Sequence, residues 1–246
     1  MKQQLDLNCD VGEGVNNEAS LMPYISSCNI SCGAHAGDVA TIDSVLQLAV
    51  ENQVKIGAHP SYPDRANFGR VVMDISPNAL KESLLAQLTL FQERLAKIPN
   101  ATLHHVKAHG ALYNASAKNT TIAETIVNVV QKACPDVSLY VPFGSVIATI
   151  AKEAGIRISY EIFADRNYQD DLQLVPRSQE NAIITHTEDV ANHVAKMVLE
   201  GNVQTLSGKL IPIQADTCCV HGDNEAAIAI VKELHQLLIQ KGIEIV

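Results

Sequence analysis

The sequence predicts an α/β fold, a distorted (β/α) barrel of about seven parallel strands. Apolar runs typical of buried strands alternate along the whole chain with segments of helical periodicity, a pattern that produces parallel sheets with helical crossovers. Several of the predicted strands end in polar or charged residues. An open sheet binds its ligand at one switch point, whereas a barrel brings every strand end to one face. Polar ends spread along the whole chain therefore favour a closed barrel.

The predicted strands are short apolar runs. They lie near residues 4–9, 29–34, 54–58, 103–108, 138–142, 156–163 and 217–221. Helical periodicity fills most of the gaps, near residues 40–52, 77–97, 120–133, 144–154, 187–200 and 223–241. The helix at 77–97 is among the clearest, because Ser76-Pro77 supplies an N-cap followed by proline at the first position.

Length and charge narrow the class of protein. The chain has 246 residues, of which 47% are hydrophobic, and a barrel of this length forms one domain, residues 1–246. The formal net charge of −9, with only 18 lysines and arginines, excludes the basic footprint of a nucleic-acid-binding protein and argues against a membrane partner. We expect a small-molecule substrate.

The cysteines and the N-terminus indicate the compartment. No secretory signal or transmembrane run is visible, since the chain enters a strand pattern near Leu5. The six cysteines form no zinc-type pair, and we expect them to be reduced thiols in a cytoplasmic protein. Cys28 and Cys32, four residues apart, leave open a ligand or redox pair.

Four strand-like segments run into a histidine followed by a small residue or proline. These histidines are His35, His59, His109 and His221. The first strand ends similarly, with the carboxylates Asp10 and Glu13 in place of histidine. We predict that these strand ends converge on one active site.

Further polar residues flank these strand ends. Lys107 and His109 share side-chain parity, so both should face the barrel interior. A buried Lys107 ammonium needs an anionic partner, either Asp10 in a salt bridge or a bound substrate anion. Asp38 and Asp165 follow predicted strands and are candidate binding residues.

Two positions late in the chain complete the candidate set. Arg166, together with Arg177 in Leu174-Val-Pro-Arg177, could grip a carboxylate bidentately. Asp223 follows the last histidine and could bind a ligand or cap the final helix. The sequence has no Walker A loop, no dinucleotide glycine motif and no GxSxG nucleophile elbow, so any nucleotide must be bound in another way.

Six motifs together resemble the LamB/YcsF family, which includes the A subunit of bacterial ATP-dependent 5-oxoprolinase. The resemblance runs from about Asp6 to Gly242. Its motifs are Asp6-Leu-Asn-Cys-Asp10 with Gly12-Glu13, Cys32-Gly-Ala-His35-Ala-Gly-Asp38, Gly57-Ala-His59-Pro60, Val106-Lys-Ala-His109-Gly-Ala-Leu-Tyr-Asn114, Phe163-Ala-Asp-Arg166 and Val220-His-Gly-Asp223.

The resemblance implies a distorted barrel similar to those of some glycoside hydrolases and deacetylases. It also implies a reaction in which L-5-oxoproline, ATP and two waters give L-glutamate, ADP and phosphate. Two further subunits, B and C, are the implied partners. In that chemistry Lys107 would stabilise negative charge, and His59 or His109, oriented by Asp10, would serve as base. Mg²⁺ accompanying ATP could be held by Asp10 or Asp223.

The remaining candidates and two rival functions stay open at this stage. His35 is a further catalytic candidate, whereas Glu13, Asp38, Asp165, Arg166 and His221 are candidates for binding substrate or nucleotide. One rival is a metal-dependent deacetylase or amidohydrolase acting alone, with an aspartate and histidine site. The other is a non-catalytic subunit that binds substrate within a complex. The sequence does not decide whether the protein itself binds a metal.

Overall fold

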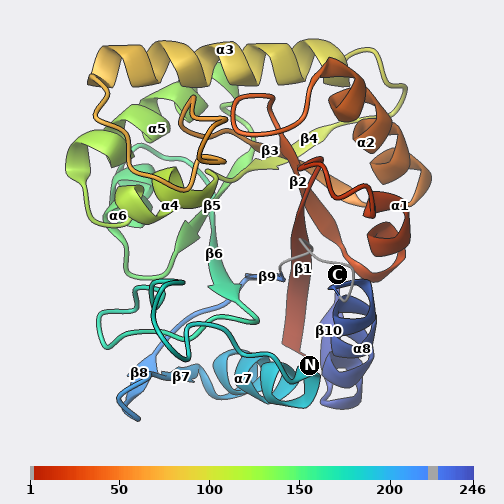
Figure 1. Ribbon diagram of the computed structural model, residues 1–246, viewed down its shortest axis with the longest axis vertical. Coiled ribbons are helices and arrows are strands. Elements are labelled where there is room, and N and C mark those ends of the chain that lie inside the picture. The colour runs from red at the N-terminus through yellow and green to blue at the C-terminus, as the bar shows by residue number, and fades with distance from the viewer. Residues whose placement is uncertain (1–2, 221–226) are drawn as a thin grey trace.

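A computed structural model, which describes residues 3–220 and 227–246, contains a closed barrel of seven parallel strands (Figure 1). The barrel strands follow one another around the ring as β1, β2, β3, β4, β5, β6 and β9, and β9 pairs with β1 to close it. The closure confirms the predicted fold class. An eighth parallel strand, β10, extends the sheet beside the start of β1.

All seven predicted strands are present. Their bounds are β1 Gln3–Val11, β2 Ser27–Ser31, β3 Lys55–His59, β4 Leu103–Val106, β5 Ser138–Pro142, β6 Ile158–Phe163 and β9 Thr217–Cys219. The strands that the sequence did not predict are short, namely β7 Asn202–Gln204 and β8 Leu210–Pro212, which form an antiparallel hairpin, and β10 Ile243–Ile245.

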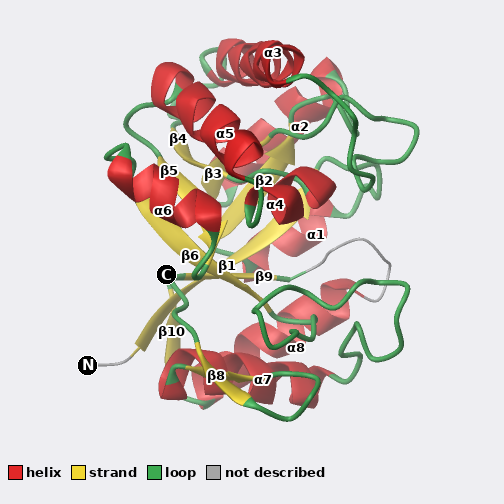
Figure 2. Cartoon of the chain, turned by 90° about the vertical axis from the view of Figure 1, so that its left-hand side faces the viewer, coloured by secondary structure: helices red, strands yellow, loops and turns green. Residues whose placement is uncertain are grey.

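Helices lie outside the barrel in both views of the chain (Figures 1 and 2). They are α1 Glu18–Leu21, the 3₁₀ helix η1 Met22–Tyr24, α2 Val39–Glu51, α3 Pro77–Leu95, α4 Gly110–Ser116, α5 Thr120–Ala133, α6 Val146–Glu153, α7 Thr187–Glu200 and α8 Ala227–Gln240. The Ser76 side chain caps α3 by accepting a hydrogen bond from the Ala79 amide, and Pro77 is the first helical residue, as predicted. None of the helices among the described residues is long and apolar enough to span a membrane.

The apolar core lies mainly between the outer face of the barrel and the helices. Residues of alternating parity on each strand, such as Leu5, Leu7 and Cys9 of β1, are buried there. All six cysteines, including Cys28 and Cys32, are buried and free. The alternate residues of each strand face the barrel interior. That interior is filled with polar side chains and not with the branched aliphatic layers common in such barrels.

Candidate active site

The carboxyl-end half of the barrel interior contains a largely buried ion-pair network around Lys107. Its ammonium lies 3.0 Å from Asp10 Oδ1 and 2.9 Å from Glu161 Oε1. The amide oxygen of Asn8, at 3.3 Å, and the thiol sulfur of Cys219, at 3.1 Å, complete its surroundings. Lys107 follows β4 directly, while its partners come from β1, β6 and β9, so closure of the barrel brings them together.

These charges stabilise one another. Burial opposes the ammonium, but neighbouring negative groups, Asp10 foremost, outweigh burial and raise the pKa of Lys107 well above its usual value. Burial likewise opposes ionisation of Asp10, yet the charges of His59 and Lys107 hold the pKa of Asp10 well below its usual value. The site therefore holds an ammonium and a carboxylate at neutral pH.

Two buried amides orient the carboxylates of this network. The His105 ring, 2.7 Å from Asn29 Oδ1, donates to this acceptor. The amide nitrogen of Asn29 donates to Asp10 Oδ1 at 2.8 Å, and the amide nitrogen of Asn8 donates to Glu161 Oε1 at 3.0 Å. Each carboxylate thus receives hydrogen bonds that fix its direction toward Lys107.

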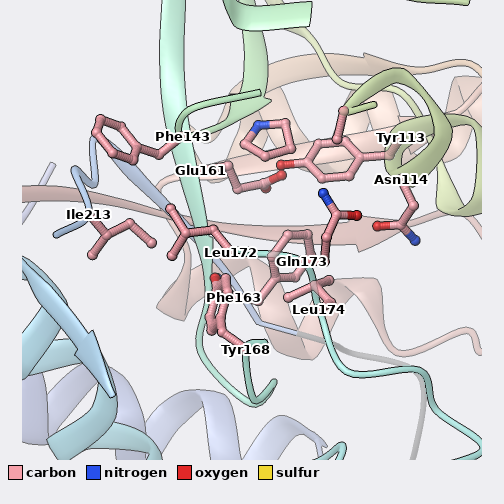
Figure 3. A pocket seen from close by; sticks show the side chains of 12 residues that line it. Tyr113, Asn114, Phe143, Glu161, Phe163, Tyr168, Leu172, Gln173, Leu174 and Ile213 are labelled. Carbon is pink, nitrogen blue, oxygen red and sulfur yellow. The ribbon is translucent and has the colours of Figure 1, made fainter. Parts of the chain in front are cut away.

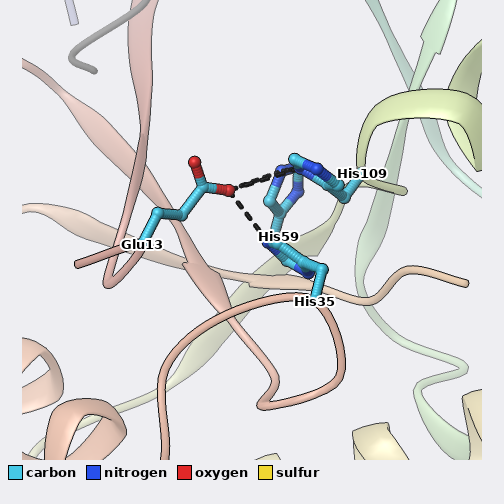
Figure 4. Close-up of side chains that lie close together, drawn as sticks. All are labelled: Glu13, His35, His59 and His109. Carbon is cyan, nitrogen blue, oxygen red and sulfur yellow. Dashed lines mark hydrogen bonds and ion pairs between the residues drawn. The ribbon is translucent and has the colours of Figure 1, made fainter. Parts of the chain in front are cut away.

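A second cluster, composed of Glu13, His35, His59 and His109, lies beside the first (Figure 4). Glu13 Oε1 lies 2.9 Å from His35 Nε2 and 3.3 Å from His109 Nδ1. The His109 Nδ1 atom is also 3.0 Å from His59 Nε2, which in turn lies 3.3 Å from Asp10 Oδ2. His59 therefore connects the histidine cluster to the ion-pair network.

Loops after β1, β2 and β4 supply Glu13, His35 and His109, whereas His59 is the last residue of β3. The loop after β3 packs closely against the start of α4. Gly110 adopts a φ of +52°, and a Cβ there would come within 2.8 Å of the Gly69 carbonyl oxygen. The next residue, Ala111, donates its amide to that same oxygen. Glycine at position 110 therefore lets this loop and α4 meet, and the Phe68 carbonyl is brought within 2.9 Å of His109 Nε2.

Burial and hydrogen bonding set the charges of the histidine cluster. Burial raises the pKa of Glu13, but the contacts of its carboxylate with the His109 and His35 rings outweigh burial and lower that pKa to about 2. Burial also lowers the pKa of His35 to about 4. For His59, burial disfavours the imidazolium, yet the charge of Asp10 prevails and raises the pKa. At neutral pH Glu13 is therefore ionised and His35 is neutral.

A cavity of about 500 Å³ opens onto both clusters. Its wall includes Asp10, Glu13, His59, Lys107 and His109. Four further cationic side chains also line it, namely Arg70, Lys118, Arg166 and Arg177. The cavity thus combines titratable groups with cations that can bind an anionic substrate.

A much smaller recess of about 20 Å³ adjoins this cavity and has room for about one water molecule (Figure 3). Glu161 and Tyr113 point toward each other across it. Burial, followed by the charge of Glu161, raises the pKa of Tyr113 well above its usual value, so the phenol stays protonated. Glu161, which also belongs to the ion-pair network, is 2% exposed.

Two of the other predicted site residues, Asp38 and Asp165, lie away from this centre. Asp38 is exposed and lies outside the cavity wall, and its carboxylate caps α2 by accepting a hydrogen bond from the Thr41 amide at 2.8 Å. Asp165 lies beyond the end of β6 and does not line the cavity. The predicted residues His221 and Asp223 lie outside the described residues.

Arg166 lines the cavity, but its guanidinium also supports the chain around it. Its Nη2 donates to the Val175 carbonyl at 2.6 Å, and its Nε donates to the Ala182 carbonyl at 3.3 Å. Arg177, in contrast, is exposed at the cavity wall. Arg166 therefore holds the segment that carries Arg177 in addition to facing the cavity.

The carbonyl of Arg166 is in turn bound by His193, which predicts a pH effect. Burial lowers the pKa of His193 to about 4, whereas histidine in an unfolded chain titrates near 6.5. The unfolded state binds more protons between these values, so stability falls as the pH drops from about 6.5 to 4. The variant His193→Gln keeps a donor for the carbonyl but has no group that titrates in this range. Urea unfolding should show that its free energy of unfolding falls by about 2 kcal/mol less between pH 6.5 and pH 4 than that of the unchanged chain. An equal reduction in His186→Gln, at an exposed position, would contradict this explanation.

Sequence reasoning did not select several residues that the structure places in the site. Asn8 lies two residues before Asp10 on β1, and Asn29 pairs with Asp10 on β2, so both side chains face the barrel interior as Asp10 does. This shared direction was the signal in the sequence that could have identified them. Arg70 and Lys118 follow no strand, so no pattern in the sequence pointed to the cavity that they line.

The comparisons with known proteins cover nearly the whole chain. The family model described as the LamB/YcsF family matches residues 5–246. The A subunit of 5-oxoprolinase from Histophilus somni is 42% identical over 98% of this chain and 97% of its own length. The protein of the same name from Staphylococcus epidermidis is 39% identical over 100% of this chain and 99% of its own length.

Solved structures agree with the fold. The lactam utilization protein from Thermus thermophilus superimposes with a TM-score of 0.91 at 35% identity, covering 98% of each chain. More distant barrels show the architecture alone. One is the T48 deacetylase, with a TM-score of 0.51 and 11% identity, covering 100% of this chain and 88% of its own. Another is a GH18 chitinase from Pseudoalteromonas aurantia, with a TM-score of 0.52 and 9% identity, covering 95% of this chain and 100% of its own. The barrel, its polar carboxyl-end face and these full-length matches lead to one conclusion: the chain belongs to the LamB/YcsF family.

Proposed function

We propose that this chain is the A subunit of an ATP-dependent 5-oxoprolinase and hydrolyses the lactam of L-5-oxoproline to L-glutamate. The observation that carries the proposal is the full-length similarity, near 40% identity, to proteins named as the A subunit of 5-oxoprolinase. In this proposal residues 1–246 act as one catalytic domain together with subunits B and C, in the cytoplasm, where the six buried cysteines would stay reduced.

The cavity suits a small anionic lactam. Its volume of about 500 Å³ exceeds what a five-membered ring needs and leaves room for a transferred phosphoryl group. The exposed Arg177 at its wall can bind the substrate carboxylate through charge-assisted hydrogen bonds. The ring amide would then lie toward Lys107 and the histidines.

The proposed chemistry makes the stable amide reactive by phosphorylation. The amide oxygen attacks the γ-phosphorus of ATP, and ADP leaves. Water adds to the activated carbon, the ring nitrogen departs as the amine of the product, and a second water releases phosphate from the resulting acyl phosphate. Lys107 stabilises negative charge on the oxygen, and His59 or His109 takes the proton from water.

Mg²⁺ would accompany ATP, but Asp10 does not fit as its ligand. Asp10 Oδ1 already accepts hydrogen bonds from Lys107 and Asn29, and Oδ2 lies 3.3 Å from His59. Both oxygens of Asp10 thus already face donors of this chain, and neither is directed at a separate cation site. The proposal therefore assigns Asp10 to orienting Lys107 and His59, and it derives no step from a protein-bound Mg²⁺.

The carboxylate-binding role predicts a kinetic effect of Arg177→Met. Loss of a charge-assisted hydrogen bond costs about 1.5–3 kcal/mol, so we expect KM for 5-oxoproline to rise about 10- to 100-fold. Steady-state kinetics of the complete complex would measure this change. The control is Arg157→Met, just before β6, where the guanidinium binds the Asp136 carbonyl away from the cavity. Equal KM values in the two variants would remove Arg177 from the substrate site.

A specific observation favours one alternative function, a metal-dependent amidohydrolase acting alone. Glu13 and the three histidines beside it resemble a metal-ligand set. Measuring ADP and glutamate release by the chain alone and then with subunits B and C separates the two functions. Turnover only in the complete, ATP-containing mixture supports 5-oxoprolinase. Turnover by the chain alone without ATP selects the alternative. No turnover at all, with partners shown to be bound, would refute the proposed function.

A further inference from the structure

Four potential ligand atoms converge at one point beside the cavity. Glu13 Oε1, His35 Nε2, His59 Nε2 and His109 Nδ1 all lie within 4.8 Å of one another. The three histidines are buried, with exposures of 1%, 0% and 4% in that order. Figure 4 shows the carboxylate pointing at the rings, which come from three other loops or strand ends.

The separations match those between the ligands of a small metal ion. Nitrogen and oxygen ligands lie about 2.0–2.2 Å from Zn²⁺, and the corners of such a tetrahedron are roughly 3.3–3.5 Å apart. Glu13 Oε1 lies 2.9, 3.3 and 3.9 Å from the nitrogens of His35, His109 and His59, and the two last nitrogens are 3.0 Å apart. Binding one ion would also require the His35 ring, which stacks nearly parallel on the His109 ring with centroids 3.8 Å apart, to tilt so that both nitrogens aim at the ion.

The outer nitrogens of two rings fix which inner nitrogens carry lone pairs. His59 Nδ1 lies 2.8 Å from the Lys107 carbonyl oxygen, and His109 Nε2 lies 2.9 Å from the Phe68 carbonyl oxygen. A carbonyl only accepts, so each outer nitrogen carries the hydrogen. If both rings are neutral, the inner nitrogens face each other at 3.0 Å with lone pairs, and either a proton on His59 or a metal ion between the rings relieves their repulsion. Metal-bound histidines are oriented in this way.

The loop that orients His109 carries backbone strain. Phe68 adopts a φ of +55°, a left-handed conformation that bulky residues rarely adopt. Its carbonyl is the acceptor for His109 Nε2, and its ring contacts His35 and His109 edge-on, with centroids 5.4 and 5.5 Å away. Strain of this kind persists where surrounding structure holds a functional geometry in place.

We propose that Glu13, His35, His59 and His109 bind one divalent transition-metal ion of the zinc type. Imidazole-rich sites prefer such ions, whereas Mg²⁺ prefers oxygen ligands. Glu13, His59 and His109 line the cavity, so the bound ion faces the space where a small substrate would lie. A proton on His59 Nε2 would compete with the metal ion for this nitrogen, which lies 3.3 Å from Asp10 Oδ2. The metal site does not depend on the proposed reaction.

Metal binding can be measured without turnover. The chain is stripped with a chelator and titrated with Co²⁺, and the visible absorption is recorded. We expect one equivalent per chain and the intense bands of four- or five-coordinate Co²⁺, without the near-ultraviolet thiolate band that binding to the cysteines would produce. Zn²⁺ should displace Co²⁺ and raise the melting temperature. Weak six-coordinate bands, a thiolate band or no saturable binding would overturn the proposal.

Variants locate the ion. His109→Ala and Glu13→Gln should each weaken Co²⁺ binding by about 100-fold or more, with circular dichroism confirming that each chain is folded. The matched control is His186→Ala, an exposed histidine before α7, which should bind Co²⁺ like the unchanged chain. Equal binding by all three variants would overturn the proposed site. If one of the two ligand variants fails to fold, the other variant and the cobalt spectrum of the unchanged chain still test whether these four residues bind the ion.

Discussion

Replacing Lys107 with methionine is expected to lower turnover of the complete complex by about 100- to 1,000-fold, the usual cost of losing one electrostatic contact to developing charge. The substitution should also destabilise the chain by about 3–5 kcal/mol, because Asp10 and Glu161 would remain buried without their cationic partner. Urea unfolding and the glutamate release assay measure the two effects separately.

A second variant separates the structural role of Lys107 from its catalytic role. Lys107→Met combined with Glu161→Gln removes one of the two unpaired charges, and the new glutamine side chain retains an oxygen that accepts from Asn8. We expect the double variant to regain part of the lost stability while turnover stays low. Turnover that recovers together with stability would show that Lys107 acts only through folding.

The second large effect is expected from Gly57→Ala. A Cβ at this position would overlap the His105 ring directly. That ring cannot easily move, because it stacks on Tyr140 with centroids 3.9 Å apart and lies 2.7 Å from Asn29 Oδ1. Overpacking of this kind costs about 3 kcal/mol. Turnover should fall as well, since Asn29 orients Asp10.

A double-mutant cycle tests this explanation. His105→Ala alone removes the donor to Asn29 and should also destabilise the chain. Combined with Gly57→Ala, however, it removes the overlap, so the double variant should be more stable than the sum of the single losses implies. Additive losses of unfolding free energy would show that the His105 ring does not limit the size of residue 57.

The barrel was predictable because strand and helix periodicities differ along the chain. Each of the seven barrel strands is an apolar run that the sequence marks. Most of the elements that the sequence missed lie outside the barrel, and they are short and in part exposed. Strand β10 and the β7–β8 hairpin have strands of three residues each, and α4 has seven residues that begin directly after His109.

The site was predictable in its membership more than in its arrangement. Strand-end position and side-chain parity selected Asp10, His59 and Lys107, which the structure brings together. The partnership of Lys107 with Glu161 depends on the curvature of the barrel, because Lys107 follows β4 and Glu161 lies on β6, and β5 separates these two strands. No local pattern encodes that approach.

The histidine cluster depends on loop conformation in the same way. His35 and His109 stack with ring centroids 3.8 Å apart, although their strands are not adjacent. The approach requires the left-handed backbone at Phe68 and the contact of Gly110 with Gly69. The sequence pattern places each histidine at a strand end, and the loops between strands determine that they meet.

The most direct test of the catalytic role of this barrel face is a comparison of two assembled complexes. One contains subunits B and C with the unchanged chain, and the other contains the Lys107→Met/Glu161→Gln chain, shown to be folded and bound. We predict that 5-oxoproline triggers equal release of glutamate and ADP from the first complex and almost no glutamate from the second. Equal glutamate release from both complexes would contradict the account, because the chemistry would then proceed without the ion-pair network.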